Sequence, residues 1–264
     1  MSFNPILLFL DFQKENKNIL LFGIRPVIEA ITSGKEIDKI FIQTGLSGEL
    51  SGELRKLIHE LKLPFQYVPA EKLNRLTSRN HQGIIAYLSL VTYQNIENIL
   101  PSVFEQGKNP LVLVLDRITD VRNFGAISRS AECAGVDAII IPARGAAQIN
   151  GDAIKTSAGA LHKIPVCRSE NLKQTIEFLK ESGLQVVACT EKTGVLYHTA
   201  DFSLPTALVM GSEEDGISEE NLRLADLQIK IPVLGEIQSL NVSVAAGIVL
   251  YEAVRQREVS SYKV

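Results

Sequence analysis

The sequence predicts an α/β protein with two α/β domains, the second of them built on a parallel sheet. From Leu111 onward, short continuous apolar runs alternate with helical patterns, which is typical of parallel strands that are buried on both faces. The first third also alternates helix-like and strand-like segments. A stretch at 94–110 that contains two prolines and a glycine separates the two regions, so we expect a linker there.

Composition narrows the classes of function. The 264 residues are 45% hydrophobic and 22% charged, which is ordinary for a soluble globular protein. The net charge of −3 argues against bulk, nonspecific nucleic-acid binding, although a local basic patch remains compatible with it. The three cysteines and four histidines are scattered without metal-ligand spacing. We therefore expect no metal site, and a reduced cytoplasmic protein with buried thiols.

The chain divides into four segments in our reading. These are an N-terminal arm (1–18), a small α/β domain (19–93), a linker (94–110) and a larger domain (111–264). Residues 4–10 are apolar but too short to cross a bilayer, so we expect neither a membrane span nor a signal peptide.

Apolar periodicity predicts the elements of the small domain. The expected helices are Arg25–Ser33, Leu54–Leu61 and Glu71–Leu76, and the expected strands are Ile40–Gln43, Phe65–Val68 and Ile84–Leu90. The polar run at 80–83, Asn-His-Gln-Gly, is either a turn or a site for a polar partner. The linker carries one short expected helix, Ile96–Phe104.

The larger domain contains six β-rich runs with helices between them. The expected strands are Leu111–Leu115, Ala138–Ile141, Lys163–Val166, Gln185–Cys189, Ala207–Met210 and Leu227–Ile231. The expected helices are Asn123–Ala134, Asn171–Glu181, Glu219–Leu224 and Val242–Arg255. The last helix is apolar almost all round, which predicts burial on several sides. A loop, Val233–Leu240, precedes it, and Ser239 or Asn241 can cap its first turn.

Ligands of parallel sheets bind beyond the carboxyl ends of the strands, and polar residues follow three of these ends. After the first strand, Asn123 is either a plain helix cap or a site residue. Arg129 lies among small residues, which let another backbone, a subunit or a substrate approach closely. An arginine there can offer a fork of donors to a phosphate or a carboxylate.

Two glycines bracket three acids after the fifth strand, in the run Gly211-Ser212-Glu213-Glu214-Asp215-Gly216. Gly211 suggests a close approach of the backbone to a ligand, or a turn with positive φ. Glu214 and Asp215 suit the start of the next helix, whereas Glu213 fits that role less well because it lies closest to the strand. Neither G-x-G-x-x-G nor a Walker A sequence occurs, which disfavours a standard dehydrogenase or ATPase.

These three segments resemble the motifs of the SpoU/TrmH-type RNA 2′-O-ribose methyltransferases in the SPOUT superfamily. The first matches at Asn123 and Arg129 with the family's six-residue spacing, the second as VMGSEEDGI and the third as IPVLGEIQSLNVSVAAGIVLYEA. The first third, with FGIRPVIEAI and NHQGI, resembles the small RNA-binding domain of the branch that methylates a guanosine ribose in 23S rRNA.

The resemblance implies a deep trefoil knot in the C-terminal domain and S-adenosylmethionine as methyl donor, without a metal. The implied cofactor contacts are backbone groups of Gly211, Ile231 and Leu240. A homodimer through the knotted domain is also implied. The apolar last helix fits a dimer interface, but burial within one subunit would give the same pattern.

The resemblance also implies the residues that carry the reaction, which are Arg129, Asn123, Glu213, Ser239 and Asn241. In the family, Arg129 is the residue usually taken to help remove the 2′-hydroxyl proton. A guanidinium has a pKa above about 12 and normally only donates hydrogen bonds. We therefore favour a role for Arg129 in binding phosphate and stabilising the developing alkoxide.

Three alternatives remain open at this point. The chain could methylate a tRNA ribose, or it could be a noncatalytic RNA-binding or ribosome-assembly protein on the same fold. The third is an unrelated nucleotide-binding α/β enzyme. Because all five polar motif positions carry the family's residues, the sequence favours activity.

Overall fold

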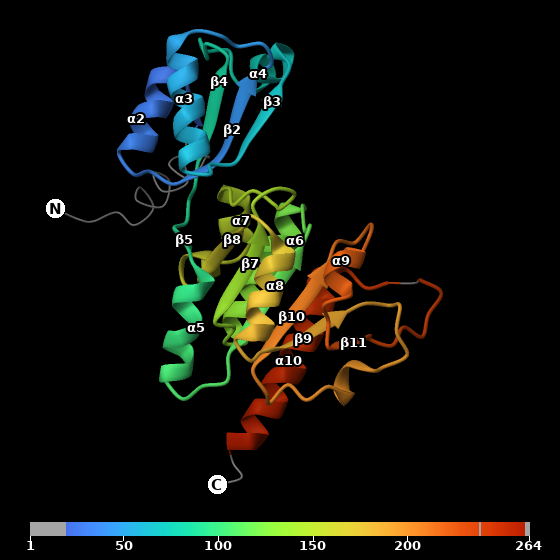
Figure 1. The fold of residues 1–264 in the computed structure, drawn as a ribbon. Helices are drawn as coiled ribbons and strands as arrows, with labels where there is room; N and C mark the ends of the chain where they lie inside the picture. The colour runs from blue at the N-terminus through green and yellow to red at the C-terminus, as the bar shows by residue number, and fades with distance from the viewer. Residues whose placement is uncertain (1–19, 238, 262–264) are drawn as a thin grey trace, which may run out of the picture. The chain divides into compact units, whose positions relative to one another are not determined.

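A computed structural model describes residues 20–237 and 239–261, with side chains up to residue 258 (Figure 1). The expected arm at 1–18 and Gln238 lie outside the described residues. The chain forms two compact units that divide between Thr92 and Tyr93, except that Ile149–Gly151 group with the first unit. In the described part of the chain, no helix has the length and hydropathy needed to cross a membrane.

The first unit is a mixed sheet with helices. Its strands, in the spatial order β1-β4-β2-β3, are β1 (Leu20–Phe22), β4 (Ile84–Leu88), β2 (Ile37–Gln43) and β3 (Phe65–Val68). Its helices are α2 (Ile24–Thr32), α3 (Glu49–Glu60) and α4 (Ala70–Leu76). Apolar side chains of α2 and α3 pack with one face of the sheet, and those of α4 contact the other.

The polar run at 80–83 is a turn, as one of the two readings predicted. Gln82 and Gly83 both have positive φ, and the Ile84 amide donates to the His81 carbonyl at 2.8 Å. The Gln82 Oε1 atom accepts from the Ile24 amide at the start of α2 at 3.4 Å. The turn therefore joins two ends of the small unit.

The second unit is built on a seven-stranded sheet in which every pairing is parallel, as predicted. The spatial order is β11 (Leu227–Ile229), β9 (Gln185–Cys189), β10 (Thr206–Gly211), β6 (Leu111–Asp116), β7 (Ala138–Pro142), β8 (Val166–Ser169) and β5 (Tyr93–Gln94). The main helices are α5 (Ile96–Glu105), α6 (Val121–Cys133), α7 (Gly151–Thr156), α8 (Leu172–Glu181), α9 (Glu219–Leu222) and α10 (Val242–Ser261). Two 3-10 turns, Ala160–His162 and Tyr197–Thr199, were not predicted.

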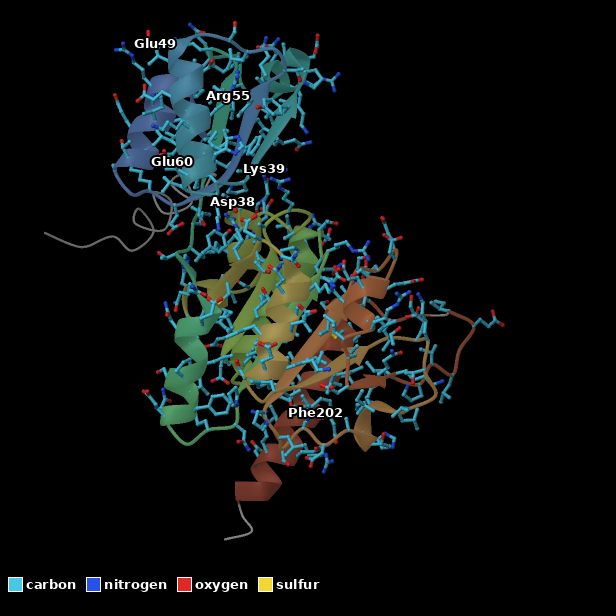
Figure 2. All side chains as sticks on the ribbon, in the orientation of Figure 1. Asp38, Lys39, Glu49, Arg55, Glu60 and Phe202 are labelled. Atoms are coloured by element: carbon cyan, nitrogen blue, oxygen red, sulfur yellow. The ribbon has the colours of Figure 1, made fainter. Side chains whose placement is uncertain are left out.

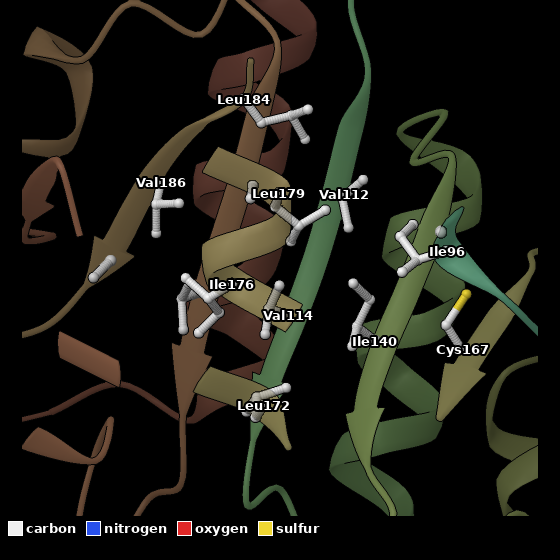
Figure 3. Packing of buried hydrophobic residues seen from close by; sticks show 14 of the residues in the cluster. Ile96, Val112, Val114, Ile140, Cys167, Leu172, Ile176, Leu179, Leu184 and Val186 are labelled. Carbon is white, nitrogen blue, oxygen red and sulfur yellow. The ribbon is translucent and has the colours of Figure 1, made fainter. Parts of the chain in front are cut away.

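Helices α5 and α8 cover one face of this sheet. Figure 3 shows Ile176 of α8 beside Val114 of β6, and Leu179 beside Val112. Ile176 and Leu179 are fully buried, and the removal of such side chains from water stabilises this layer. Alternate strand residues point to the opposite face, where α6 and α10 pack.

Two predicted boundaries differ from the structure. The strand expected at Lys163–Val166 lies at Val166–Ser169, because Ala160–His162 forms a 3-10 turn that carries the chain toward the sheet. The strand expected at Leu227–Ile231 ends at Ile229, since Lys230 makes only an isolated bridge to Leu196. Elsewhere the expected elements of this unit occur within a few residues of their predicted ends.

The segment expected to be a linker, 94–110, packs with the larger unit. Tyr93 and Gln94 form β5, which pairs with β8 at the edge of the sheet. Ile96 and Leu100 of α5 belong to the main apolar core, at 5% and 2% exposure. The apolar spacing of α5 explains this packing, because a helix with one apolar face must cover it.

The expectation of three buried thiols is only partly correct. Cys167 is buried and Cys189 is half-buried, and burial raises the pKa of these thiols to about 12 and about 11. Cys133 is exposed near the end of α6. All three are free thiols.

Helix α10 is longer than predicted and is not buried on all sides. Val242, Ala246, Val249 and Ala253 are buried, but Val244 and Tyr251 are 51% and 53% exposed in this chain. These two residues are seven apart and so share one stripe of the helix. The trefoil knot stays a prediction.

The end of α10 is fixed by Arg257, whose guanidinium donates to four backbone carbonyls. The acceptors are Asn109, Pro110, Phe202 and Leu204, at 2.7 to 3.1 Å. Gln256 adds a donor bond to the Ala200 carbonyl and accepts from the Phe202 amide. Phe202 itself is fully buried, and Figure 2 labels it near α10.

Helix α6 approaches α7 closely at Gly125. A Cβ atom there would lie 2.7 Å from the Thr156 Cβ and 2.9 Å from the Ala153 carbonyl oxygen. At this position, the small residue of α6 therefore allows the backbone of α7 in the same chain to approach closely.

We expect Gly125→Ala to destabilise the larger unit by about 1–3 kcal/mol, because the added methyl overpacks the α6–α7 contact. Urea unfolding followed by circular dichroism measures the change. The matched control is Gly52→Ala in α3, where a Cβ meets no atom within 4 Å and greater helix propensity should stabilise by up to about 1 kcal/mol. Equal effects of the two substitutions would contradict the close α6–α7 contact.

Candidate functional site

A cavity of about 380 Å³ lies beyond the carboxyl ends of β9, β10 and β11. Its lining includes Gly211, Ile231 and Leu240, the three residues named from the family resemblance as cofactor contacts. Glu213 and Ser239 from the same resemblance also line it. The location agrees with the rule that parallel sheets bind ligands at this edge.

Asn241 joins the three motif segments through its side chain. Its Nδ2 donates to Asn123 Oδ1 at 2.9 Å and to Glu213 Oε1 at 2.7 Å. Its Oδ1 accepts from the Ser243 amide at 2.9 Å and therefore caps α10, as predicted. One amide thus fixes the start of α10 against residues that follow β6 and β10.

Asn123 is not the helix cap of α6, and that reading is wrong. Asp120 is the N-cap, because its carboxylate accepts from the Asn123 amide at 2.7 Å. Asn123 lies in the first turn of α6, where its side-chain oxygen is available to Asn241. The N-cap lies three residues earlier than the sequence reading placed it, because the aspartate there accepts from the free amides at the start of the helix.

Glu213 does contact a helix N-terminus, but a distant one. Its Oε1 accepts from the Val242 amide of α10 at 3.1 Å as well as from Asn241. Negative charge is favoured at that position by the helix dipole. Asp215 instead pairs with Arg117 at 3.3 Å.

Gly211 has a structural role within its own loop. Its φ is not positive, so the reading as a turn with positive φ is wrong, and the atoms closest to where a Cβ would lie belong to the loop itself. A Cβ would lie 2.1 Å from the Gly216 carbonyl carbon, because Ser212 and Gly216 pair across a tight loop. Any larger residue would push this loop open. The close approach of its backbone to a ligand stays a prediction.

Arg129 does not line the cavity of its own chain. It is exposed on α6, and its side chain makes no hydrogen bond or salt bridge to another residue in the described ranges. The neighbouring residue Ser130 lies at the contact with α10, 3.9 Å from where a Cβ on Gly247 would be. The structure therefore gathers Asn123, Glu213 and Asn241 but leaves Arg129 outside this group.

A buried carboxylate holds the acidic loop in place, and sequence reasoning gave it no role. Asp116, 3% exposed at the end of β6, accepts from the Ser218 amide at 2.7 Å and from Asn221 Nδ2 at 3.0 Å. It also pairs with Arg117 at 3.2 Å. The signal was a charged residue directly after a continuous apolar strand, where burial requires partners.

Arg117 extends this network to the loop itself. Its φ is +60°, an uncommon conformation for a residue with a side chain. Its guanidinium donates to the Gly216 carbonyl at 3.2 Å and to Asp215. The side-chain donors of Arg117 are therefore engaged with the loop.

Charges of both signs line the cavity. The acidic side chains are Glu191, Glu213, Glu214 and Asp215, and the basic ones are Lys192 and Lys230. Within residues 20–237 and 239–261, no cluster of three or more His, Cys, Asp or Glu side chains could hold a metal ion. The cavity therefore suits a ligand that carries both positive and negative groups.

Comparison with family models gives two matches. Residues 110–251 match the SpoU rRNA Methylase family, and residues 20–94 match the family described as RNA 2′-O ribose methyltransferase substrate binding. A protein of Staphylococcus saprophyticus, described provisionally as a TrmH family tRNA/rRNA methyltransferase, is 37% identical over 241 residues. That match covers 91% of this chain and 97% of the relative.

Solved structures give similar matches. The AdoMet-bound rRNA methyltransferase from Sinorhizobium meliloti has 27% identity and a TM-score of 0.58, covering 92% of this chain and 89% of that one. The TrmH/SpoU tRNA modifying enzyme of A. aeolicus has 35% identity and a TM-score of 0.53, covering 62% of this chain and 85% of that one.

We expect Asp116→Asn to destabilise the larger unit by about 1–3 kcal/mol, because an amide in this position leaves a buried donor unpaired. Urea unfolding measures the loss, and hydrogen exchange at the Gly216 and Ser218 amides should locate it in the loop. Glu219→Gln is the matched control, since its pair with Arg223 is highly exposed and should change stability by less than about 0.5 kcal/mol. Slow exchange preserved at both amides would contradict the role of Asp116.

Proposed function

The chain belongs to the SpoU rRNA Methylase family and is an RNA 2′-O-ribose methyltransferase, and we propose that its substrate is a guanosine in 23S rRNA. Its methyl donor is S-adenosylmethionine, which supplies a methyl group on a sulfonium. The geometry that supports methyl transfer is the bonded group of Asn241, Asn123 and Glu213 beside the cavity that Gly211, Ile231 and Leu240 line.

The cavity fits this cofactor in size and charge. A volume of about 380 Å³ lies within the usual range for small-molecule sites. Carboxylates such as Glu213 suit a sulfonium cation, and Lys192 or Lys230 suit the carboxylate of a methionine group. Aliphatic and glycine positions such as Ile231 and Gly211 leave backbone groups to recognise the adenine.

Coverage of the relatives favours ribosomal RNA over transfer RNA. The rRNA methyltransferase from Sinorhizobium meliloti matches 92% of this chain, which includes both units, whereas the tRNA enzyme of A. aeolicus matches 62%. A match to the substrate-binding family at 20–94 adds to this argument. A tRNA ribose remains the second candidate, because relatives with high coverage are described as tRNA/rRNA methyltransferases.

The reaction would take place in the cytoplasm.

The polar residues position the reacting groups. We assign Asn123, Glu213, Ser239 and Asn241 to holding the ribose and the loops in register. Arg129 binds an RNA phosphate and stabilises the developing alkoxide, which requires only hydrogen-bond donation. Transfer also needs the attacking oxygen in line with the methyl carbon and sulfur, and fixed loops provide that alignment.

A second copy of the chain would complete the site. The exposed stripe of α10 with Val244 and Tyr251 is apolar and suits an interface. Arg129 lies one residue from the contact between α6 and α10, and it is outside its own cavity. We propose a homodimer through the knotted unit in which Arg129 reaches the cavity of the partner.

Titration calorimetry and tritium transfer test the function. We expect S-adenosylmethionine to bind, and labelled methyl groups to enter 23S rRNA from cells that lack the protein, with tRNA unlabelled. Mass mapping of ribose methylation then identifies the nucleotide. Label in tRNA alone would support the second candidate, and cofactor binding without transfer to any RNA would support a noncatalytic protein.

Arg129→Ala should lower methyl transfer by about 10²- to 10³-fold, because a donor to the developing charge is lost. The affinity for S-adenosylmethionine should stay the same, since Arg129 does not line the cavity of its own chain. Arg223→Ala, which removes another exposed arginine, is the matched control and should keep full activity. Wild-type turnover by Arg129→Ala would exclude a role in stabilising the alkoxide, and wild-type RNA affinity, measured separately, would exclude phosphate binding.

Mixed dimers test the shared site. If Arg129 acts in the partner's cavity, co-expressed Arg129→Ala and Asn241→Ala chains form heterodimers with one intact site. Random pairing in a two-fold dimer then restores roughly a quarter of wild-type activity, although each variant alone is inactive. No recovery in purified heterodimers would show that Arg129 acts within its own subunit.

A further inference from the structure

The small unit has one sheet face that its helices cover only in part. Leu73 of α4 packs over Phe41 and Val68, on the β2 and β3 side. The remaining part of this face is formed by β1 and β4, where Phe22 and Tyr87 are half-buried. Aromatic side chains are therefore left with accessible ring surface on one side of the sheet.

Three cationic side chains lie over aromatic rings of this face. The Lys39 and Lys72 ammonium groups lie 5.1 and 4.9 Å from the centroid of the Phe41 ring. The Arg79 guanidinium lies 5.3 Å from the centroid of the Phe22 ring. We call this surface, formed by Lys39, Lys72, Arg79, Phe22 and Tyr87, the cationic sheet face.

Strand register fixes the spacing of these groups. Phe22 and Phe41 are both paired with Ile85 of the strand between them, so the two rings lie two strands, or about 10 Å, apart. Tyr87 is paired with Lys39 in the next row of the same face. Figure 2 shows Lys39 near the start of β2.

The cations on this face lack acidic partners within hydrogen-bond reach. None of the three makes a salt bridge to a carboxylate in the part of the chain that the structure describes. Burial and then repulsion from Lys72 lower the pKa of Lys39, and only Asp38 opposes this. Two ammonium groups held over one ring are stabilised by an anion between them.

We propose that the cationic sheet face binds a single-stranded segment of the substrate RNA. Phosphates contact the three cations, and a base stacks on Tyr87. Three closely spaced cations complement the RNA backbone, and accessible rings beside them favour unpaired bases over an acidic peptide. The proposal rests on the proposed function, because it assigns where the RNA of that reaction is held.

The test is RNA affinity as a function of salt concentration for a triple variant, Lys39→Gln with Lys72→Gln and Arg79→Gln. The probes are transcribed 23S rRNA and a uridine oligonucleotide. Each lost phosphate contact should lower the slope of log affinity against log salt by about 0.7, so the slope should fall by about 2. The affinity for S-adenosylmethionine should not change, and the KM for RNA should rise with kcat nearly constant.

The matched control removes the same charge elsewhere on the small unit, with Lys35→Gln, Lys56→Gln and Lys62→Gln. These lysines lie on or next to α2 and α3, so the control should keep wild-type affinity and slope. Equal losses in the two triple variants would overturn the proposal, because net charge alone would explain them. Thermal unfolding of both variants confirms that the small unit is folded.

Tyr87→Leu tests the stacking step separately. We expect about tenfold weaker binding of the uridine oligonucleotide with an unchanged salt slope, because a leucine fills the position without a ring face. Unchanged affinity would overturn stacking on Tyr87. If the wild-type protein bound neither RNA probe, the proposed function would fail together with this inference. Binding by wild type and the triple variant alike would reject the cationic sheet face alone.

Discussion

The site depends on one amide group that must satisfy three segments at once. Asn241 donates to Asn123 and Glu213 and also caps its own helix through Ser243. These bonds join residues that are up to 118 positions apart in the sequence. They can form together only if α10 begins at the carboxyl edge of the sheet. The geometry of the site therefore depends on the path that the chain takes to this edge.

A second layer of polar contacts makes that arrangement rigid. Buried Asp116 and the strained Arg117 hold the acidic loop through hydrogen bonds to Ser218 and Gly216. Gly211 has no side chain, so the loop can fold against the end of β10. Glu213 is presented at the cavity because the loop is held in this way. The acidic run is therefore divided, with Asp215 serving the scaffold and Glu213 serving the junction with α10.

Much of the sheet could be predicted from the sequence, because β6, β7, β9 and β10 are continuous apolar runs whose burial on both faces leaves little choice. Edge strand β5 could not, since its two residues have no pattern of their own and pair only because α5 docks beside them. Apolar periodicity also overstated the burial of α10, because it cannot distinguish a core residue from an exposed one such as Tyr251.

The candidate site was accessible from sequence mainly where motif residues were polar and followed strands. The resemblance to the family's motifs identified Asn123, Glu213 and Asn241, but their bonds to one another depend on tertiary geometry. The role of Asp116 was missed because a carboxylate at the end of an apolar strand suggests burial but does not identify the amides that it binds. The exposure of Arg129 likewise depends on the packing of α6 against α10, which no local pattern encodes.

The hydrogen bonds of Arg257 affect which part of the fold stays intact when pH or salt concentration changes. Its guanidinium is held by carbonyl dipoles from four residues, with Asp137 as the charged group nearby. Carbonyl groups neither gain protons in acid nor exchange partners with dissolved ions, in contrast to the carboxylates of surface ion pairs. The contacts that hold the carboxyl-terminal turn of α10 should therefore persist at high salt concentration and at low pH. Unfolding under these conditions should begin in another part of the molecule.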